Sequence, residues 1–134
     1  MQSTQAVTIL LVEDNPDHAM LTMRALKDGN LLNKVFWVKD GAEALDFLYH
    51  RGPYADVTKA PRPGLILLDI KLPKMDGHEV LGQIKRDADL RAIPTVMLTT
   101  SSQDDEVRHC YAAGANSYVS KPVRFVDFLA HGAP

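Results

Sequence analysis

The sequence predicts an α/β domain in which a parallel five-stranded sheet is covered by helices on both faces. Short apolar runs alternate five times with amphipathic stretches along the 134 residues. The run 65–68 is apolar at four consecutive positions, as expected of a strand buried on both sides. Alternation of this kind is typical of doubly wound sheets, because right-handed crossovers keep the strands parallel.

Five runs have the composition of strands. They are rich in β-branched, aromatic or aliphatic side chains, and turn-forming residues such as Gly, Pro, Asn and Asp separate them from the next stretch. The predicted strands are 8–12, 34–38, 65–68, 95–98 and 117–119.

A helix is predicted after each strand, from capping residues and from apolar side chains at helical spacing. The first begins at Pro16, whose missing N–H costs nothing in a first turn, and stops at Gly29-Asn30. The second and third follow Asp40-Gly41 and Asp76-Gly77. The fourth, over about 104–113, has Ser102 as N-cap and Gly114 as stop, and the last is short, over 123–129. An irregular loop is expected over 52–63, which contains three prolines.

The charge balance, the cysteine count and the length of the apolar runs argue against several classes of function. With 15 basic and 17 acidic residues the net charge is −2, which gives no electrostatic case for a nucleic-acid partner. The one cysteine, Cys110, excludes an internal disulfide, and no apolar run approaches the ~20 residues that span a bilayer. We expect one cytoplasmic domain over residues 1–134, without a membrane or nucleic-acid partner.

Charged residues gather at the ends of the predicted strands. Glu13 and Asp14 close the first strand, Asp69 closes the third, and Lys121 follows the fifth. In a parallel sheet these four positions share the carboxyl edge, where functional sites of such folds lie. Three carboxylates in one small volume repel one another, so a divalent cation is the simplest way to keep them ionised. Oxygen ligands suit Mg²⁺.

Taken in order, these motifs resemble the receiver domain of two-component response regulators over about residues 8–129. The pattern consists of Glu13-Asp14, Asp69 within Leu-Leu-Asp-Ile-Lys-Leu-Pro-Lys-Met-Asp-Gly, Thr99 after Val-Met-Leu, and Lys121 within Tyr-Val-Ser-Lys-Pro. The resemblance implies a single flavodoxin-like receiver domain with strand order 2-1-3-4-5 and five helices.

The resemblance also implies a metal-assisted phosphoryl transfer. Asp69 would be the phosphoacceptor, forming an acyl phosphate. Mg²⁺, with Mn²⁺ as an alternative, would be held by Glu13, Asp14, Asp69 and the backbone carbonyl of Lys71. Glu13 stands where many members of the family carry Asp.

The remaining implied roles concern the switch. Lys121 and the Thr99 hydroxyl would bind phosphoryl oxygens, and Tyr118 would turn inward as Thr99 moves. The surface around 103–120 would then change shape. The residues that would tune hydrolysis of the acyl phosphate are Lys71, Thr100 and Ser101.

The long loop, the Leu-Thr-Thr-Ser stretch and the absence of an effector domain resemble stand-alone regulators of bacterial and cyanobacterial phytochromes. The implied partner is a sensor histidine kinase, with a phytochrome as candidate, and a homodimer stays open. We interpret the chain as a signalling protein with autophosphorylation and autodephosphorylation chemistry, not as an enzyme.

Alternatives are a phosphate sink or relay, and an unphosphorylated pseudo-receiver that acts by binding alone. A haloacid-dehalogenase-type phosphatase would need a second acid where Lys71 stands. A flavodoxin-like electron carrier would need a Ser/Thr/Gly-rich loop where Glu13-Asp14 stands.

Several other residues are interpreted as structural. Trp37 is expected to pack on its strand edge, Asp17 and Asp76 to be helix-start charges, and His18 to be the one histidine near the site. The methionines expected to fill the core are Met20, Met23, Met75 and Met97.

Overall fold

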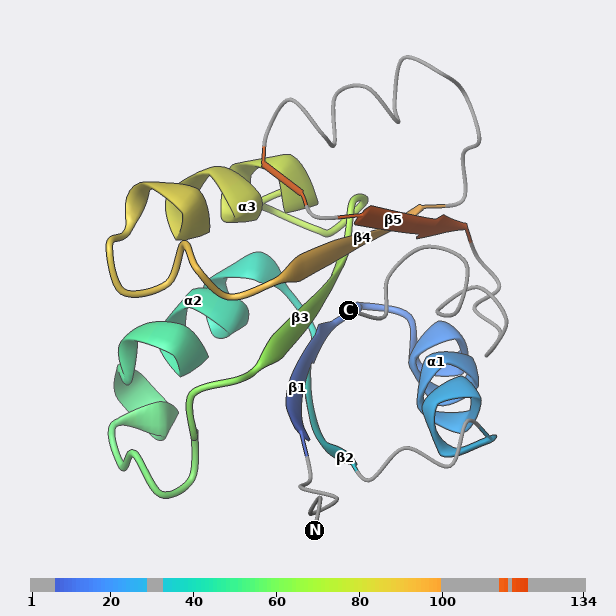
Figure 1. The fold of residues 1–134 in the computed structure, drawn as a ribbon, viewed down its shortest axis with the longest axis horizontal. Helices are drawn as coiled ribbons and strands as arrows, with labels where there is room; N and C mark the ends of the chain where they lie inside the picture. The colour runs from blue at the N-terminus through green and yellow to red at the C-terminus, as the bar shows by residue number, and fades with distance from the viewer. Residues whose placement is uncertain (1–6, 29–32, 100–113, 116, 121–134) are drawn as a thin grey trace, which may run out of the picture.

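The computed structural model describes residues 7–28, 33–99, 114–115 and 117–120, which form one sheet with helices on both sides (Figure 1). All neighbouring strands are parallel, in the order β2-β1-β3-β4-β5. The strands are β1 (Val7–Val12), β2 (Asn33–Val38), β3 (Leu65–Asp69), β4 (Thr95–Thr99) and β5 (Ser117–Ser120). The predicted fold class and strand order are confirmed.

Three helices lie in the described part of the chain. α1 (Pro16–Asp28) covers one face of the sheet, and α2 (Gly41–Tyr49) and α3 (Gly77–Arg86) cover the other (Figure 1). The fourth and fifth predicted helices lie outside the described residues. The loop after α2 is not wholly irregular, because a 3₁₀ turn, η1 (Gly52–Tyr54), opens it; here the prediction is wrong, since a proline in a first turn also favours such a helix.

Alternation along the strands divides the core into two layers. Leu10 of β1 and Ile66 of β3 belong to the cluster beneath α2 and α3, whereas Leu11 and Leu67, one position along, belong to the cluster beneath α1. Successive side chains of a strand point to opposite faces, so an apolar run fills both layers. This two-sided burial fixes the strand register and with it the positions of the strand ends.

The prediction that Met20 fills the core is wrong, because its side chain is 67% exposed. The buried stripe of α1 runs through Ala19 and Leu26, and Met20 is turned about 100° from Ala19 around the helix axis. Met97 is fully buried, as predicted, and Met23 and Met75 are partly buried against the core.

The register places three strand ends at one edge. Val12 pairs with Leu68, and Asp69 pairs with Leu98, so the residues that follow β1 and close β3 and β4 emerge together. None of the helices in the described ranges is long and apolar enough to cross a membrane.

Candidate functional site

Glu13 and Asp14 follow the carboxyl end of β1 and differ in exposure. The Glu13 side chain is fully buried, whereas Asp14 is exposed. The Glu13 N–H donates to the carbonyl of Val38 (3.0 Å), which continues the β1–β2 ladder by one residue. Its Oε2 accepts the N–H of Asn15 (3.1 Å), and His18 Nδ1 lies 4.0 Å from the same oxygen. Hydrogen bonds therefore join Glu13 to β2 and to the turn at Asn15, which follows Glu13 in the chain.

Asn15 makes that turn. Its Oδ1 accepts the N–H groups of Asp17 (2.9 Å) and His18 (3.2 Å), so Asn15 caps α1 and Pro16 occupies the first helical position. The predicted helix start at Pro16 is confirmed, but no capping residue was predicted for this helix. An Asn directly before Pro at a helix start was the available signal.

Asp69 ends β3 beneath the start of α3. The Ile70 N–H donates to the carbonyl of Leu98 (3.0 Å), and the Lys71 N–H lies 3.4 Å from Asp69 Oδ1. The Gly77 N–H donates to the Ile70 carbonyl (2.7 Å). A Cβ at Gly77 would stand 2.2 Å from the carbonyl oxygen of Asp69, so only glycine allows α3 to start this close to the strand.

Carboxylate oxygens of Glu13, Asp14 and Asp69 all lie within 4.8 Å of one another. Octahedral Mg²⁺ binds oxygen at ~2.1 Å, which puts its ligand atoms about 2.9 to 4.2 Å apart. The upper bound of 4.8 Å exceeds the largest of these separations by about 0.6 Å, so side-chain adjustments of this order would bring the three oxygens into the range that the ion requires. Glu13 and Asp69 are buried, and buried carboxylates this close to each other need a compensating positive charge to stay ionised. The donor set fits a hard divalent cation, and the predicted convergence of the three acids is found.

Thr99 closes β4 beside Asp69 and is 4% exposed. Asp69 pairs with Leu98 and Thr99 with Ser120, so Thr99 stands between the acidic cluster and β5. Tyr118 lies on β5, where only its backbone is described. The remaining predicted site residues outside the described part are Thr100, Ser101 and Lys121.

Trp37 contributes a contact that the sequence did not predict. Its indole Nε1–H donates to the carbonyl oxygen of Glu13 at 2.7 Å, and its ring packs against the apolar cluster beneath α1. The interpretation of Trp37 as a packing residue is therefore incomplete. Nothing in local sequence spacing marks this contact, because it joins residues 24 positions apart.

A hydrogen-bonded group ties the long loop to the start of α2. Asp40 caps α2 by accepting the Glu43 N–H (2.7 Å), and Glu43 accepts the Lys39 N–H (3.0 Å) and the Tyr54 hydroxyl (2.6 Å). Partial burial, together with the bond to Glu43 and its charge, raises the pKa of Tyr54 to about 12.

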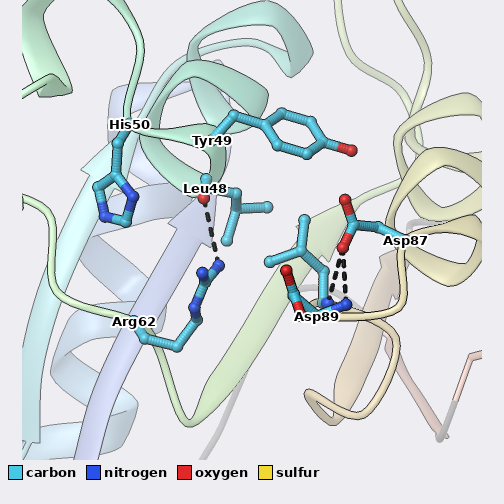
Figure 2. A pocket seen from close by; sticks show the side chains of 7 residues that line it. Leu48, Tyr49, His50, Arg62, Asp87 and Asp89 are labelled. Atoms are coloured by element: carbon cyan, nitrogen blue, oxygen red, sulfur yellow. Dashed lines mark hydrogen bonds between the residues drawn. The ribbon is translucent and has the colours of Figure 1, made fainter.

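A pocket of about 190 Å³ lies at the opposite end of the sheet, near the amino end of β3 (Figure 2). Arg62 donates to the carbonyl of Leu48 (3.2 Å), and one Asp87 oxygen accepts the N–H groups of Asp89 (2.7 Å) and Leu90 (3.2 Å). These charged groups stabilise the end of α2 and the turn after α3.

Residues 9–131 match the model of the response regulator receiver domain. The chain belongs to this family. It is 48% identical over 128 residues to the probable methanogenesis regulatory protein FilR2 of Methanothrix harundinacea, covering 95% of the chain and 79% of FilR2. It is 42% identical over 128 residues to the response regulator Rcp1 of Synechocystis sp., covering 96% and 85% of the two chains.

Solved structures agree with this assignment. The bacteriophytochrome response regulator RtBRR has a TM-score of 0.84 at 45% identity, over 94% of this chain and 75% of RtBRR. The Mn²⁺-bound form of Rcp1 has a TM-score of 0.78 at 40% identity, over 92% and 87%. The chain is thus a receiver similar to phytochrome-associated regulators. Receivers accept a phosphoryl group in two-component signalling, bind a divalent metal and have histidine kinases as partners.

Proposed function

We propose that Asp69 is the phosphoacceptor of this receiver and that Glu13, Asp14 and Asp69 bind Mg²⁺, with the backbone carbonyl of Lys71 as a further ligand. The observation that carries this proposal is the convergence of three carboxylates within 4.8 Å at the carboxyl edge of the sheet. Mn²⁺ is the alternative ion, in keeping with the similarity to Rcp1, whose Mn²⁺-bound form is known.

In the proposed reaction an Asp69 carboxylate oxygen attacks the phosphorus of a phosphohistidine on the kinase. A P–O bond forms, the P–N bond breaks, and the electron pair leaves with the histidine nitrogen. The Lys71 N–H, 3.4 Å from Asp69 Oδ1, helps to orient the carboxylate. When bound, the metal neutralises charge on the transferred group. The product is an acyl phosphate on Asp69.

We assign Thr99 the switch role, because it joins the acidic cluster to β5. Its hydroxyl would move to hydrogen-bond the phosphoryl group, and Lys121 would bind a second oxygen as a compact cation. Thr99 pairs with Ser120, so such a movement would reach the strand that carries Tyr118. Phosphorylation would thereby bias the surface around 103–120 between two states. Tuning of hydrolysis is assigned to Lys71, Thr100 and Ser101.

The residues of the site favour a signalling role over repeated hydrolysis of a phosphorylated substrate. A phosphatase of the haloacid-dehalogenase type needs a general acid two residues after its nucleophile, and Lys71 occupies that position. The chain would catalyse only its own phosphorylation and dephosphorylation. A stable acyl phosphate would make it an output switch, and a short-lived one would make it a phosphate sink or relay.

The proposed partner is a sensor histidine kinase of the cytoplasm, with a bacteriophytochrome as candidate. The similarity to RtBRR and Rcp1 supports this choice. A homodimer through the 103–120 surface is a further proposal. The net charge of −2 favours a protein partner over nucleic acid or an anionic membrane.

The test is Mg²⁺-dependent labelling by a small phosphodonor. Native protein should be labelled, and Asp69→Asn should lose the label. The matched control is Asp76→Asn, because Asp76 lies in the next loop and caps α3, a role that asparagine also fills. Labelling that survives in Asp69→Asn contradicts the assignment. A native protein that neither labels nor binds Mg²⁺ would instead be an unphosphorylated interaction module.

A further inference from the structure

We propose that Trp37 is a positioning residue of the metal site. Its indole N–H holds the carbonyl of Glu13 and so fixes where the buried Glu13 carboxylate stands relative to Asp14 and Asp69. The inference rests on the proposed Mg²⁺ site and extends it to a side chain on the neighbouring strand.

Glu13 has more freedom to lose than an aspartate at the same position, because its side chain contains one more rotatable bond. The structure restrains it at three points. Its N–H donates to the Val38 carbonyl (3.0 Å), its carbonyl accepts the Trp37 indole N–H (2.7 Å), and its Oε2 accepts the Asn15 N–H (3.1 Å). Of these three hydrogen bonds, the one from Trp37 is made by a side chain of the partner and therefore depends on residue type. The His18 side chain also approaches Glu13, with Nδ1 4.0 Å from Oε2, but it meets the carboxylate and not the backbone.

Trp37 is itself well placed to act as a fixed donor. In the sheet it pairs with Leu11, and its indole reaches two residues further along β1 to the Glu13 carbonyl. Its ring packs against the apolar cluster beneath α1, and Lys39 Nζ lies 5.4 Å from the ring centroid. The same ring thus joins the core to the first residue of the acidic cluster.

The consequence concerns metal affinity. Mg²⁺ requires near-octahedral geometry, so a carboxylate ligand that is displaced from its position weakens metal binding. Without the indole donor, the Glu13 carbonyl would turn towards water and the end of β1 would loosen. One neutral hydrogen bond is worth about a fivefold change in an equilibrium constant, and at most about tenfold. We therefore expect Trp37→Phe to weaken Mg²⁺ binding about fivefold.

The decisive comparison is Trp37→Phe with Val35→Ala. Trp37→Phe removes the donor but keeps an aromatic ring. Val35 also lies on β2 and packs against the same cluster, but its backbone pairs with Ile9, away from the acids. Both variants should lower the melting temperature. In Mg²⁺ titration calorimetry only Trp37→Phe should shift the dissociation constant, with Val35→Ala within twofold of native.

The outcomes separate this inference from the proposed function. Native protein that binds Mg²⁺, with the same affinity in Trp37→Phe, overturns the inference alone. Equal losses in both variants overturn it too, since they indicate a packing effect. Native protein without Mg²⁺ binding overturns the proposed function and this inference together.

A second measurement decides the matter if Trp37→Phe does not fold. Trp37 is the single tryptophan of the chain, so native emission reports this indole alone. Saturation with Mg²⁺, established by calorimetry, should shift that emission, because the indole is hydrogen-bonded to the backbone of Glu13, whose carboxylate is a proposed ligand. An unchanged spectrum at saturation overturns the inference.

Discussion

Gly77→Ala tests whether the phosphoacceptor strand and α3 are held at a distance that only glycine allows. The added Cβ would lie 2.2 Å from the Asp69 carbonyl oxygen and 2.8 Å from the Ile70 Cα. Both are backbone atoms, so no side-chain rotation can relieve the contact. An ordinary contact would require roughly 1 Å of separation between the strand and the helix, which is overpacking of the kind that costs about 1–3 kcal/mol.

The expected net loss of stability from Gly77→Ala is about 2 kcal/mol. The upper end of the overpacking range applies because backbone meets backbone, and up to about 1 kcal/mol of helix propensity offsets it. For a domain of this size the melting temperature should fall by roughly 5–10 °C. Because the displaced atom belongs to Asp69, phosphodonor labelling should fall as well. Denaturant unfolding and labelling of the same preparation measure both effects.

The control is Gly82→Ala in the same helix. There the nearest atom to the new Cβ is Arg86 Nη1 at 3.2 Å, at the far end of a flexible side chain. This substitution should stabilise the protein by up to about 1 kcal/mol and leave labelling unchanged. Surface substitutions usually change the free energy of unfolding by no more than about 0.5 kcal/mol. If the free energy of unfolding of Gly77→Ala lies within that range of native, the close approach of α3 to β3 does not constrain the site.

Two further predictions concern the helix starts. Burial and the bond to Glu43 raise the pKa of Tyr54 to about 12, so its stabilising effect is complete below pH ~10 and disappears as the pH rises towards 12. The tyrosinate absorbance should show this late ionisation, and a Tyr54→Phe titration curve identical to native would contradict it. Asp76→Ala removes the acceptor of the His78 and Glu79 N–H groups and should cost about 1 kcal/mol in denaturant unfolding. Asp76→Asn should recover most of that loss; no recovery would argue against capping.

The sequence was sufficient for the fold class and for the acids of the site because both depend on local rules. The apolar run that ends at Val12 and the run that ends at Leu68 mark buried strands without any knowledge of their neighbours. Parallel strands end at a common edge of the sheet. The alternation of strands and helices in the sequence therefore predicts that Glu13, Asp14 and Asp69 lie close together.

Local periodicity was less reliable where several contacts compete for one residue. Met20 fits a helical stripe of apolar residues, but the stripe that meets the sheet runs through Ala19, and Met20 faces outward. The 3₁₀ turn at Gly52–Tyr54 was missed because its residues also suit an irregular loop, and the Tyr54–Glu43 bond joins that turn to α2.

The amino-acid order therefore determined which residues end the strands and which acids meet. Only the tertiary structure decided how those acids are held, because the contacts of Trp37 with Glu13 and of Gly77 with Asp69 join separate elements. Such contacts depend on the distance between a strand and its neighbour, and short-range patterns of hydrophobicity carry no record of that distance.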